Sequence, residues 1–188
     1  MVTRITGGAY RGRKVRSRTS RGLRPTLESV RAAIYSMVGD LFVDGARVLD
    51  LFAGTGALGI EALSRGAVHA DFVELNAGRC RDIKASLKEL GLEGFGDVHV
   101  GRVEKVLLKL RQSYRLVLAA PPYDDNPWSQ IMNTINDKDI LENNGLVVTD
   151  HRKNVELLNS YGRLFKRKER RYGDTVVTIY GVGSLDSG

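Results

Sequence analysis

Three glycines follow a short apolar run at a spacing that lets the backbone cradle a ligand. In the segment DLFAGTGALG, Gly54 and Gly56 permit a tight turn and a close approach to the ligand. Gly59 permits the helix that follows to pack closely on the preceding strand. This GxGxxG pattern between a strand and a helix indicates a nucleotide-type cofactor site. Taken alone, it fits a dinucleotide as well as other cofactors.

Two acidic residues in register with the glycines narrow the choice of cofactor. Asp50 stands at the end of the strand before the loop, and Glu74 ends the next predicted strand. A carboxylate beside the loop would repel a pyrophosphate, but it would attract the sulfonium and ammonium groups of S-adenosylmethionine. Glu74 is placed to accept hydrogen bonds from the ribose hydroxyls. Taken alone, Asp50 also fits a helix cap and Glu74 also fits a surface acid, but together they favour S-adenosylmethionine.

The segment LVLAAPPYDD, residues 116–125, brings a second kind of chemistry to the end of another apolar run. Pro121 and Pro122 fix the backbone, and Tyr123 offers a ring that can stack on a flipped-out base. A polar residue usually precedes such a Pro-Pro-Tyr, but here Ala120 occupies that position. The motif predicts a site for an amino-bearing base that lacks one hydrogen-bond acceptor.

Basic residues gather near both ends of the chain, whose net charge is +7. Between residues 1 and 31 the only acidic residue is Glu28, and a second basic cluster covers residues 163–171. This distribution favours a surface for a polyanion such as nucleic acid. His69, His99 and His151 are scattered without a partner acid or metal-ligand spacing, so we expect structural or surface roles for them and no metal site.

Alternating apolar runs and amphipathic segments indicate the elements that position these residues. We expect strands at 47–52, 70–75, 98–101, 114–120 and 146–150, with helices at 57–64, 77–90 and 103–110 between them. Strands at 163–171 and 175–180 form a hairpin whose turn contains Gly173 and Asp174. The predicted fold is therefore α/β, with a mostly parallel sheet and an antiparallel C-terminal edge.

The division of the chain is predicted from its composition. Residues 1–45 form a basic N-terminal extension, with a short hairpin around Gly7 and Gly8 or Gly12 and a helix from Pro25 and Thr26 to about Val38. Residues 46–182 form the main domain, and 183–188 are a tail. The 188 residues suffice for one compact domain. Without an apolar run near roughly 18 residues or a secretory signal, we expect a cytoplasmic protein.

The motifs together resemble class I S-adenosylmethionine-dependent methyltransferases that modify an exocyclic amino group. The segments RITGGAYRGRKV, RPTLESVRAAIYSMV, VLDLFAGTGALGIEALSRGA and RRYGDTVVTIY extend the resemblance over most of the chain to the RsmD family. These bacterial enzymes methylate the N2 amino group of a guanine in 16S ribosomal RNA. The resemblance implies a Rossmann-like class I methyltransferase fold with a seven-stranded sheet and S-adenosylmethionine as donor. It also implies a monomer whose partner is 16S ribosomal RNA in the small ribosomal subunit or an assembly intermediate.

The resemblance also assigns roles to residues. The catalytic segment is Ala120, Pro121, Pro122 and Tyr123. The cofactor-binding set is Asp50, Phe52, Gly54, Thr55, Gly56, Glu74, Leu75, Arg102 and Val103. The RNA-binding set is Arg4, Arg11, Arg13, Arg24, Arg31, Arg171 and Tyr172. Related enzymes often carry an acid near Arg102 that contacts the adenine amino group, so we expect adenine recognition here to rest on the backbone, Leu75 and Val103.

Ala120 departs from the family pattern at the position where the family has a hydrogen-bond acceptor for the target amino group. The family uses the carbonyl of the residue at Pro121 and an Asp or Asn side chain just before it to accept hydrogen bonds from the target amino group. Losing one such contact costs on the order of 3 kcal/mol. Three explanations compete: a deliberately inactivated form, a natural variant with slow turnover, or substitution by Asp124 or Asp125. We favour an impaired enzyme.

Two other functions are compatible with parts of the sequence. One is a non-catalytic RNA-binding or ribosome-assembly protein on a methyltransferase scaffold. The other is a nicotinamide-dependent oxidoreductase that uses the GxGxxG loop, and Asp50 and the Pro-Pro-Tyr argue against it.

Overall fold

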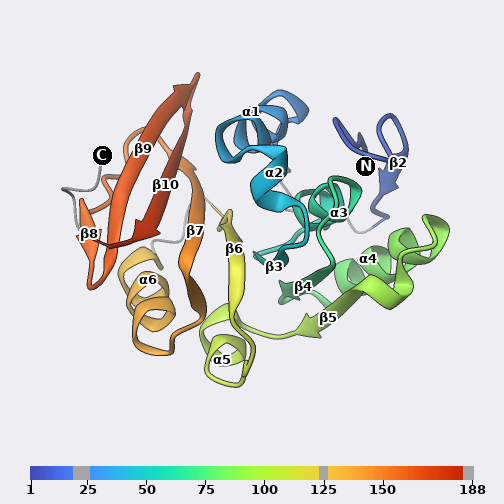
Figure 1. The fold of residues 1–188 in the computed structure, drawn as a ribbon. Coiled ribbons are helices and arrows are strands. Elements are labelled where there is room, and N and C mark those ends of the chain that lie inside the picture. Colours follow the sequence, from blue (N-terminus) through green and yellow to red (C-terminus); the bar gives the residue numbers. More distant parts are fainter. Residues whose placement is uncertain (19–25, 123–126, 184–188) are drawn as a thin grey trace.

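The computed structural model describes residues 1–18, 26–122 and 127–183, and one mixed sheet crosses the whole of it (Figure 1). Its strands are β3 (Arg47–Leu51), β4 (His69–Glu74), β5 (Gly96–Val100), β6 (Tyr114–Ala119), β7 (Leu141–Arg152), β8 (Ser160–Tyr161), β9 (Leu164–Tyr172) and β10 (Thr175–Val182). They lie in the order β5-β4-β3-β6-β7-β10-β9-β8. The pairings from β5 to β7 are parallel, whereas β10 runs antiparallel to β7 and β9.

The predicted α/β fold with an antiparallel C-terminal edge is confirmed, with two differences in the strands. Among the described residues the sheet has eight strands rather than seven, because Ser160 and Tyr161 pair with β9 at its outer edge. β7 begins at Leu141 rather than Leu146, since the polar residues 142–144 hide the start of the strand from a hydrophobicity pattern. The predicted turn between the last two strands contains Gly173, whose φ is 63°.

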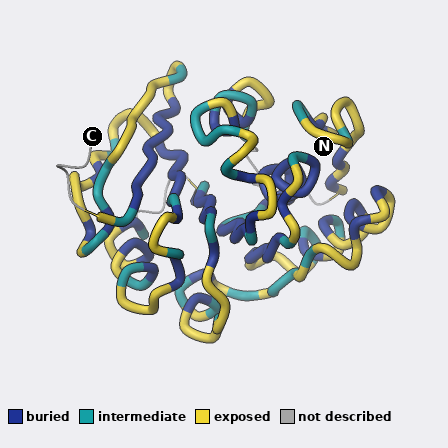
Figure 2. Tube along the Cα trace, in the orientation of Figure 1, coloured by how far each residue is buried: buried dark blue, intermediate teal, exposed yellow. Residues whose placement is uncertain are grey.

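Helices cover both faces of the sheet. Helices α1 (Glu28–Val38), α3 (Ala57–Ser64) and α4 (Ala77–Glu89) pack on one face, and α5 (Val103–Leu107) and α6 (Trp128–Asp137) pack on the other. Two short helices, α2 (Asp40–Val43) and η1 (Glu93–Phe95), complete the helical segments. The central strands are buried along most of their length (Figure 2), because parallel strands covered on both faces need apolar residues on both. No helix in the described ranges is both long and apolar enough to cross a lipid bilayer.

The N-terminal residues form a separate two-stranded unit beside α3 and α4. Strand β1 (Val2–Arg4) pairs antiparallel with β2 (Lys14–Arg16), and the glycines expected at the hairpin lie in the loop between them. The loop contacts the end of α3, where the Ala9 amide donates to the Ser64 carbonyl at 2.7 Å. The segment after β2 contacts α4, where the Ser17 hydroxyl donates to the Asp82 carboxylate at 2.9 Å.

The chain order defines where the sheet can bind a ligand. From β3 the chain continues outward to β4 and β5, and it then returns to place β6 on the other side of β3. A parallel sheet has its crevice at the carboxyl ends of the strands where this change of direction occurs. The loops after β3 and β6, which carry the two predicted motifs, meet at that point.

Candidate active site

A cavity of about 470 Å³ opens at the carboxyl ends of the parallel strands. Its walls come from the loops after β3, β4, β5 and β6, together with the start of α3 and the segment around Thr26 and Arg31. The predicted cofactor-binding and catalytic residues that line it are Phe52, Gly54, Thr55, Glu74, Leu75, Arg102, Val103, Ala120, Pro121 and Pro122. The structure therefore brings the glycine loop and the Pro-Pro segment to one cavity. Tyr123, Asp124 and Asp125 lie outside the described residues.

The loop after β3 has an unusual backbone. Gly54 and Gly56 have φ values of 58° and 75°, in the left-handed region that glycine adopts without penalty. Phe52 also has a positive φ, 59°, which is strained for an aromatic residue. Such strain gathers at functional sites, where the surrounding structure enforces it. The sequence predicted Phe52 only through the family resemblance, because no pattern reveals its backbone angle.

Glu74 joins β4 to the glycine loop. Its Oε2 atom accepts a hydrogen bond from the Gly54 amide at 2.9 Å, and its Oε1 atom accepts one from the Asn76 amide at 2.8 Å. Arg79 lies 3.6 Å from the same carboxylate. The side chain is almost fully buried but still lines the cavity. Each carboxylate oxygen can accept a second hydrogen bond, so Glu74 has acceptor capacity left for a ligand.

Asp50 requires a correction. Its carboxylate is buried, does not line the cavity, and accepts a hydrogen bond from the Gly59 amide at 2.9 Å. Burial raises the pKa of Asp50 to about 8, against the effect of the Gly59 amide, and the charge of Glu74 raises it further. Asp50 therefore caps the first turn of α3 from the core, and its carboxylate lies behind the cavity wall.

Gly59 has the packing role that its position predicts. A Cβ atom at this residue would lie 2.4 Å from Cε1 of Phe72 and 3.1 Å from Oδ2 of Asp50. The first distance is one that real Cβ atoms essentially never show, and the second is tighter than most Cβ contacts, so glycine suits this close approach of α3 to the sheet. The close approach places the N-terminus of α3 at the cavity wall formed by Thr55 and Ala57.

The wall formed by the segment after β5 contains an acid that the sequence reasoning missed. Arg102 precedes α5 and lines the cavity, and Glu104 lines it as well. The Gly101 amide donates to the Glu74 carbonyl at 3.0 Å, which ties this segment to the end of β4. Leu75 is exposed, and Val103 is buried in the core beneath α5. Glu104 thus provides a carboxylate near the position where the family pattern places one.

A second missed residue follows Thr149 of β7, which pairs with Ala119 at the end of β6. Asp150, near the end of β7, is buried and accepts a hydrogen bond from the Thr26 hydroxyl at 3.0 Å. Thr26 lines the cavity together with Ala120. Strand pairing is needed to see this neighbourhood, because Ala120 and Asp150 are far apart in the sequence.

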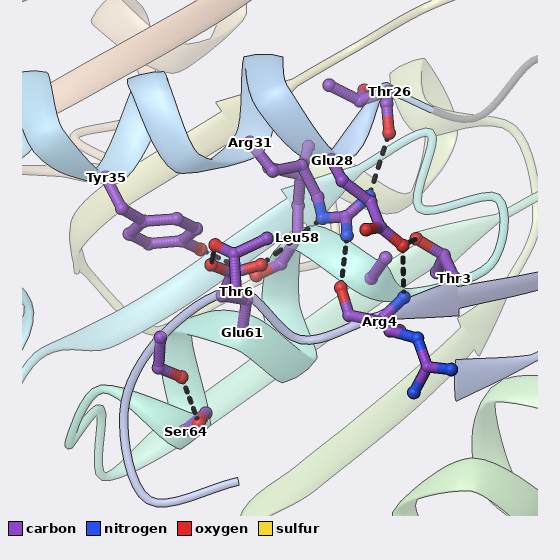
Figure 3. Close-up of polar contacts among 12 residues, drawn as sticks. Thr3, Arg4, Thr6, Thr26, Glu28, Arg31, Tyr35, Leu58, Glu61 and Ser64 are labelled. Atoms are coloured by element: carbon purple, nitrogen blue, oxygen red, sulfur yellow. Dashed lines mark hydrogen bonds and ion pairs between the residues drawn. The ribbon is translucent and has the colours of Figure 1, made fainter. Parts of the chain in front are cut away.

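Arg31 is not the surface residue that the prediction assumed. Its side chain is 1% exposed and lies 3.3 Å from the Glu61 carboxylate, which is fully buried. Two further hydrogen bonds run from its guanidinium to the carbonyls of Thr26 (2.8 Å) and Arg4 (2.6 Å), as Figure 3 shows. Glu61 also accepts hydrogen bonds from Thr6 and Arg65. Arg31 is therefore withdrawn as an RNA-binding residue, since its charge is used inside the protein.

Most other members of the predicted RNA-binding set are at the surface. Arg4, Arg11, Arg13 and Arg171 are exposed, and Tyr172 is half-buried with its hydroxyl 3.5 Å from Sδ of Met37. Arg4, Arg11 and Arg13 belong to the N-terminal unit, whereas Arg171 and Tyr172 end β9, and α1 lies between the two groups (Figure 1). Arg24 lies outside the described residues.

Two histidines have partner acids that the sequence reasoning did not see. Nε2 of His99 lies 2.7 Å from Oδ1 of Asp71, and Nε2 of His69 lies 3.2 Å from Oδ2 of Asp97. The hydrogen bond to Asp71 raises the pKa of His99, against the effect of burial. His69 and Asp71 are two residues apart on β4, and Asp97 and His99 are two residues apart on β5, so each pair lies on one face of its strand. The parallel pairing of β4 with β5 brings all four to the same face of the sheet.

Comparisons with known proteins bear on the whole chain. A family described as conserved hypothetical protein 95 matches residues 3–181. The Bacillus subtilis protein YlbH is 36% identical over 180 residues, which cover 94% of this chain and 97% of YlbH. Ribosomal RNA small subunit methyltransferase D of Escherichia coli is 32% identical over 149 residues, covering 78% of this chain and 73% of that protein. The solved structure of Escherichia coli yhhF superposes with a TM-score of 0.87 at 26% identity, covering 98% of this chain and 100% of yhhF.

Proposed function

This chain belongs to the RsmD family. We propose that it transfers a methyl group from S-adenosylmethionine to the N2 amino group of a guanine in 16S ribosomal RNA. The observation that carries the proposal is the single cavity that unites the glycine loop, Glu74 and the Ala120-Pro121-Pro122 segment. One side of such a cavity holds a cofactor, and the other holds a base.

The cofactor half of the site is assigned from the groups that line it. Glu74 accepts hydrogen bonds from the ribose hydroxyls, since its carboxylate oxygens retain acceptor capacity inside the cavity. The start of α3 offers backbone N–H groups and a positive dipole end to the carboxylate of the methionine portion. Glu104 accepts from the adenine amino group, a role that the sequence interpretation had left to the backbone, Leu75 and Val103.

The target half of the site follows from the chemistry of the amino group. The lone pair of a guanine N2 is delocalised into the ring, so acceptors aimed at its N–H bonds favour the geometry from which it attacks. The nitrogen then bonds to the methyl carbon, and the carbon–sulfur bond breaks with its electron pair left on sulfur. The Pro121 carbonyl supplies one acceptor, and stabilisation realised only in the transition state raises the rate.

The exposed basic residues position the RNA. Arg4, Arg11 and Arg13 on one side of α1, and Arg171 on the other, contact phosphates without reading the base sequence. The half-buried Tyr172 packs at the end of the same β9 edge. We expect a monomer that acts on the small subunit or an assembly intermediate.

Calorimetric titration tests the cofactor assignment. The chain is expected to bind S-adenosylhomocysteine and not NAD. Binding of NAD alone would end the methyltransferase interpretation and favour an oxidoreductase.

A second candidate function rests on Ala120, which accepts no hydrogen bond through its side chain. In that case the protein binds the small subunit and its cofactor but turns over slowly or not at all. Methyl transfer to unmodified small subunits by the chain and by Ala120→Asp distinguishes the two functions. Equal inactivity of both proteins would favour the binding role.

A further inference from the structure

Asp150 lies across the strand pair from the position where the expected acceptor is missing. Strands β6 and β7 are parallel, and their register matches Leu118 with Val148 and Ala119 with Thr149. The next residues along the two chains are Ala120 and Asp150. Neighbouring strands are about 4.8 Å apart, so a side chain at one position reaches the space beside the other.

The side chains of Ala120 and Asp150 point to the same face of the sheet. Side chains alternate between the faces along a strand, and Val148 packs in the core beneath α1, α3 and α4, as Ala120 does. Asp150, two residues after Val148, therefore points to that face. The hydrogen bond from Thr26, which precedes α1, comes from the same side.

A partly buried hydrogen bond from Thr26 connects the carboxylate to the cavity wall. The Thr26 hydroxyl donates to Oδ2 of Asp150 at 3.0 Å, and Thr26 and Ala120 both line the cavity. The Thr26 carbonyl is fixed in turn by the Arg31 guanidinium, which pairs with Glu61 (Figure 3). A carboxylate oriented in this way costs little reorganisation when a charge develops nearby.

On the basis of the proposed function, we propose that Asp150 is a catalytic residue that accepts a hydrogen bond from the target amino group. It thereby supplies from β7 the acceptor that Ala120 cannot supply from the end of β6. As the nitrogen–carbon bond forms, the carbon–sulfur bond breaks and its electron pair stays on sulfur, which becomes a neutral thioether. The methylated nitrogen then gives its excess proton to the Asp150 carboxylate, from which it passes to solvent.

A set of variants in two backgrounds tests this role. Asp150→Asn, Asp150→Glu and Glu142→Gln are each made in the chain as it stands and in Ala120→Asp. Asn keeps the shape of the side chain, but its one acceptor oxygen is taken by the Thr26 hydroxyl, so its NH2 group faces the target amino group. Glu142 is the control acid at the other end of β7. The single-turnover rate of methyl transfer to unmodified small subunits is measured at saturating cofactor. Affinity for S-adenosylhomocysteine and thermal unfolding are measured separately.

Asp150→Asn is expected to lower the rate in the Ala120 background by about a hundredfold, the effect of losing one such contact. Cofactor affinity stays within about twofold, Asp150→Glu restores part of the rate, and Glu142→Gln matches its parent. In the Ala120→Asp background the loss shrinks to about fivefold or less, because a second acceptor is present.

Three results would overturn the role of Asp150 while the proposed function stands. The first is an equal loss of rate for Asp150→Asn in both backgrounds, which indicates a purely structural carboxylate. The second is no loss of rate for Asp150→Asn in the Ala120 background. The third is an active Ala120→Asp protein beside an inactive parent. If Ala120→Asp binds the cofactor but transfers no methyl group, the proposed function fails and the role of Asp150 with it.

Discussion

The Glu74 carboxylate accepts a hydrogen bond from the Gly54 amide at 2.9 Å, which ties the end of β4 to the glycine loop after β3. The other carboxylate oxygen accepts from the Asn76 amide, and Asn76 caps α4 by accepting from the Gly78 and Arg79 amides. One buried side chain thus shapes the loop, fixes the entry to α4 and forms part of the cavity wall.

Glu74→Gln is expected to weaken binding of S-adenosylhomocysteine by about 10- to 100-fold, since a hydrogen bond to a charged group contributes roughly 1.5 to 3 kcal/mol. The amide keeps the size of the side chain but replaces one acceptor with a donor. Calorimetry measures the loss, with Glu93→Gln, an exposed acid in η1, as the control. Affinities of the two variants within twofold of each other would remove Glu74 from the cofactor site.

Gly8→Ala is expected to destabilise the contact between the N-terminal unit and α3. A Cβ atom at Gly8 would lie 1.8 Å from the Ser64 carbonyl oxygen, whereas one at Gly12 would have nothing within 4 Å. Both glycines have similar positive φ values, 76° and 81°, so the backbone strain of alanine is matched. Urea unfolding is expected to show an extra loss of about 1 to 3 kcal/mol for Gly8→Ala. Equal losses would mean that the loop moves freely away from α3.

Arg31→Met is expected to lower the free energy of unfolding by about 3 to 5 kcal/mol, because it removes one of the two arginines that pair with the buried Glu61 carboxylate. Arg11→Met is the matched control at an exposed arginine, where we expect no more than about 0.5 kcal/mol. Arg11→Met is expected to lower the affinity for small subunits, because it removes an exposed positive charge and leaves the fold intact. Equal stability of the two variants in urea would contradict the structural role assigned to Arg31.

Asp50→Asn is expected to change how stability depends on pH. The carboxyl group has a pKa of 3.8 when unfolded and about 8 when folded, so over that window the folded state keeps a proton that the unfolded state has lost. The free energy of unfolding of the parent therefore falls as pH rises from 3.8 to about 8, and this contribution is constant above that range. Asn has no such titration, so the variant gains stability relative to its parent across the window. Urea midpoints at pH 5, 7 and 9 give the comparison, and parallel curves would show that Asp50 is ionised in the fold.

The features that local sequence patterns predicted are those that depend on chain neighbours. The apolar runs located the parallel strands, and the spacing of the glycines predicted both the loop and the close packing at Gly59. The pairing of Gly173 with Asp174 predicted the turn of the last hairpin. In each case the physical requirement acts within a few residues, so the sequence displays it directly.

The features that the sequence did not predict depend on strand register or burial. Ala120 and Asp150 become neighbours only through the pairing of β6 with β7. Arg31 looked like part of a basic surface, although it lies three and four residues before Ile34 and Tyr35, which are buried on the same face of α1. That helical spacing indicates that Arg31 is buried. Burial of its charge is possible because Glu61 of α3 pairs with it, and Glu61 is far from Arg31 in the sequence.

The proposed methyl transfer is tested most directly by nucleoside analysis of 16S ribosomal RNA after unmodified small subunits are incubated with Ala120→Asp and S-adenosylmethionine. We expect N2-methylguanosine at a level approaching one per subunit, with a slower rise for the chain that carries Ala120. Cofactor binding without any methylated guanosine in either reaction would contradict the proposed methyl transfer.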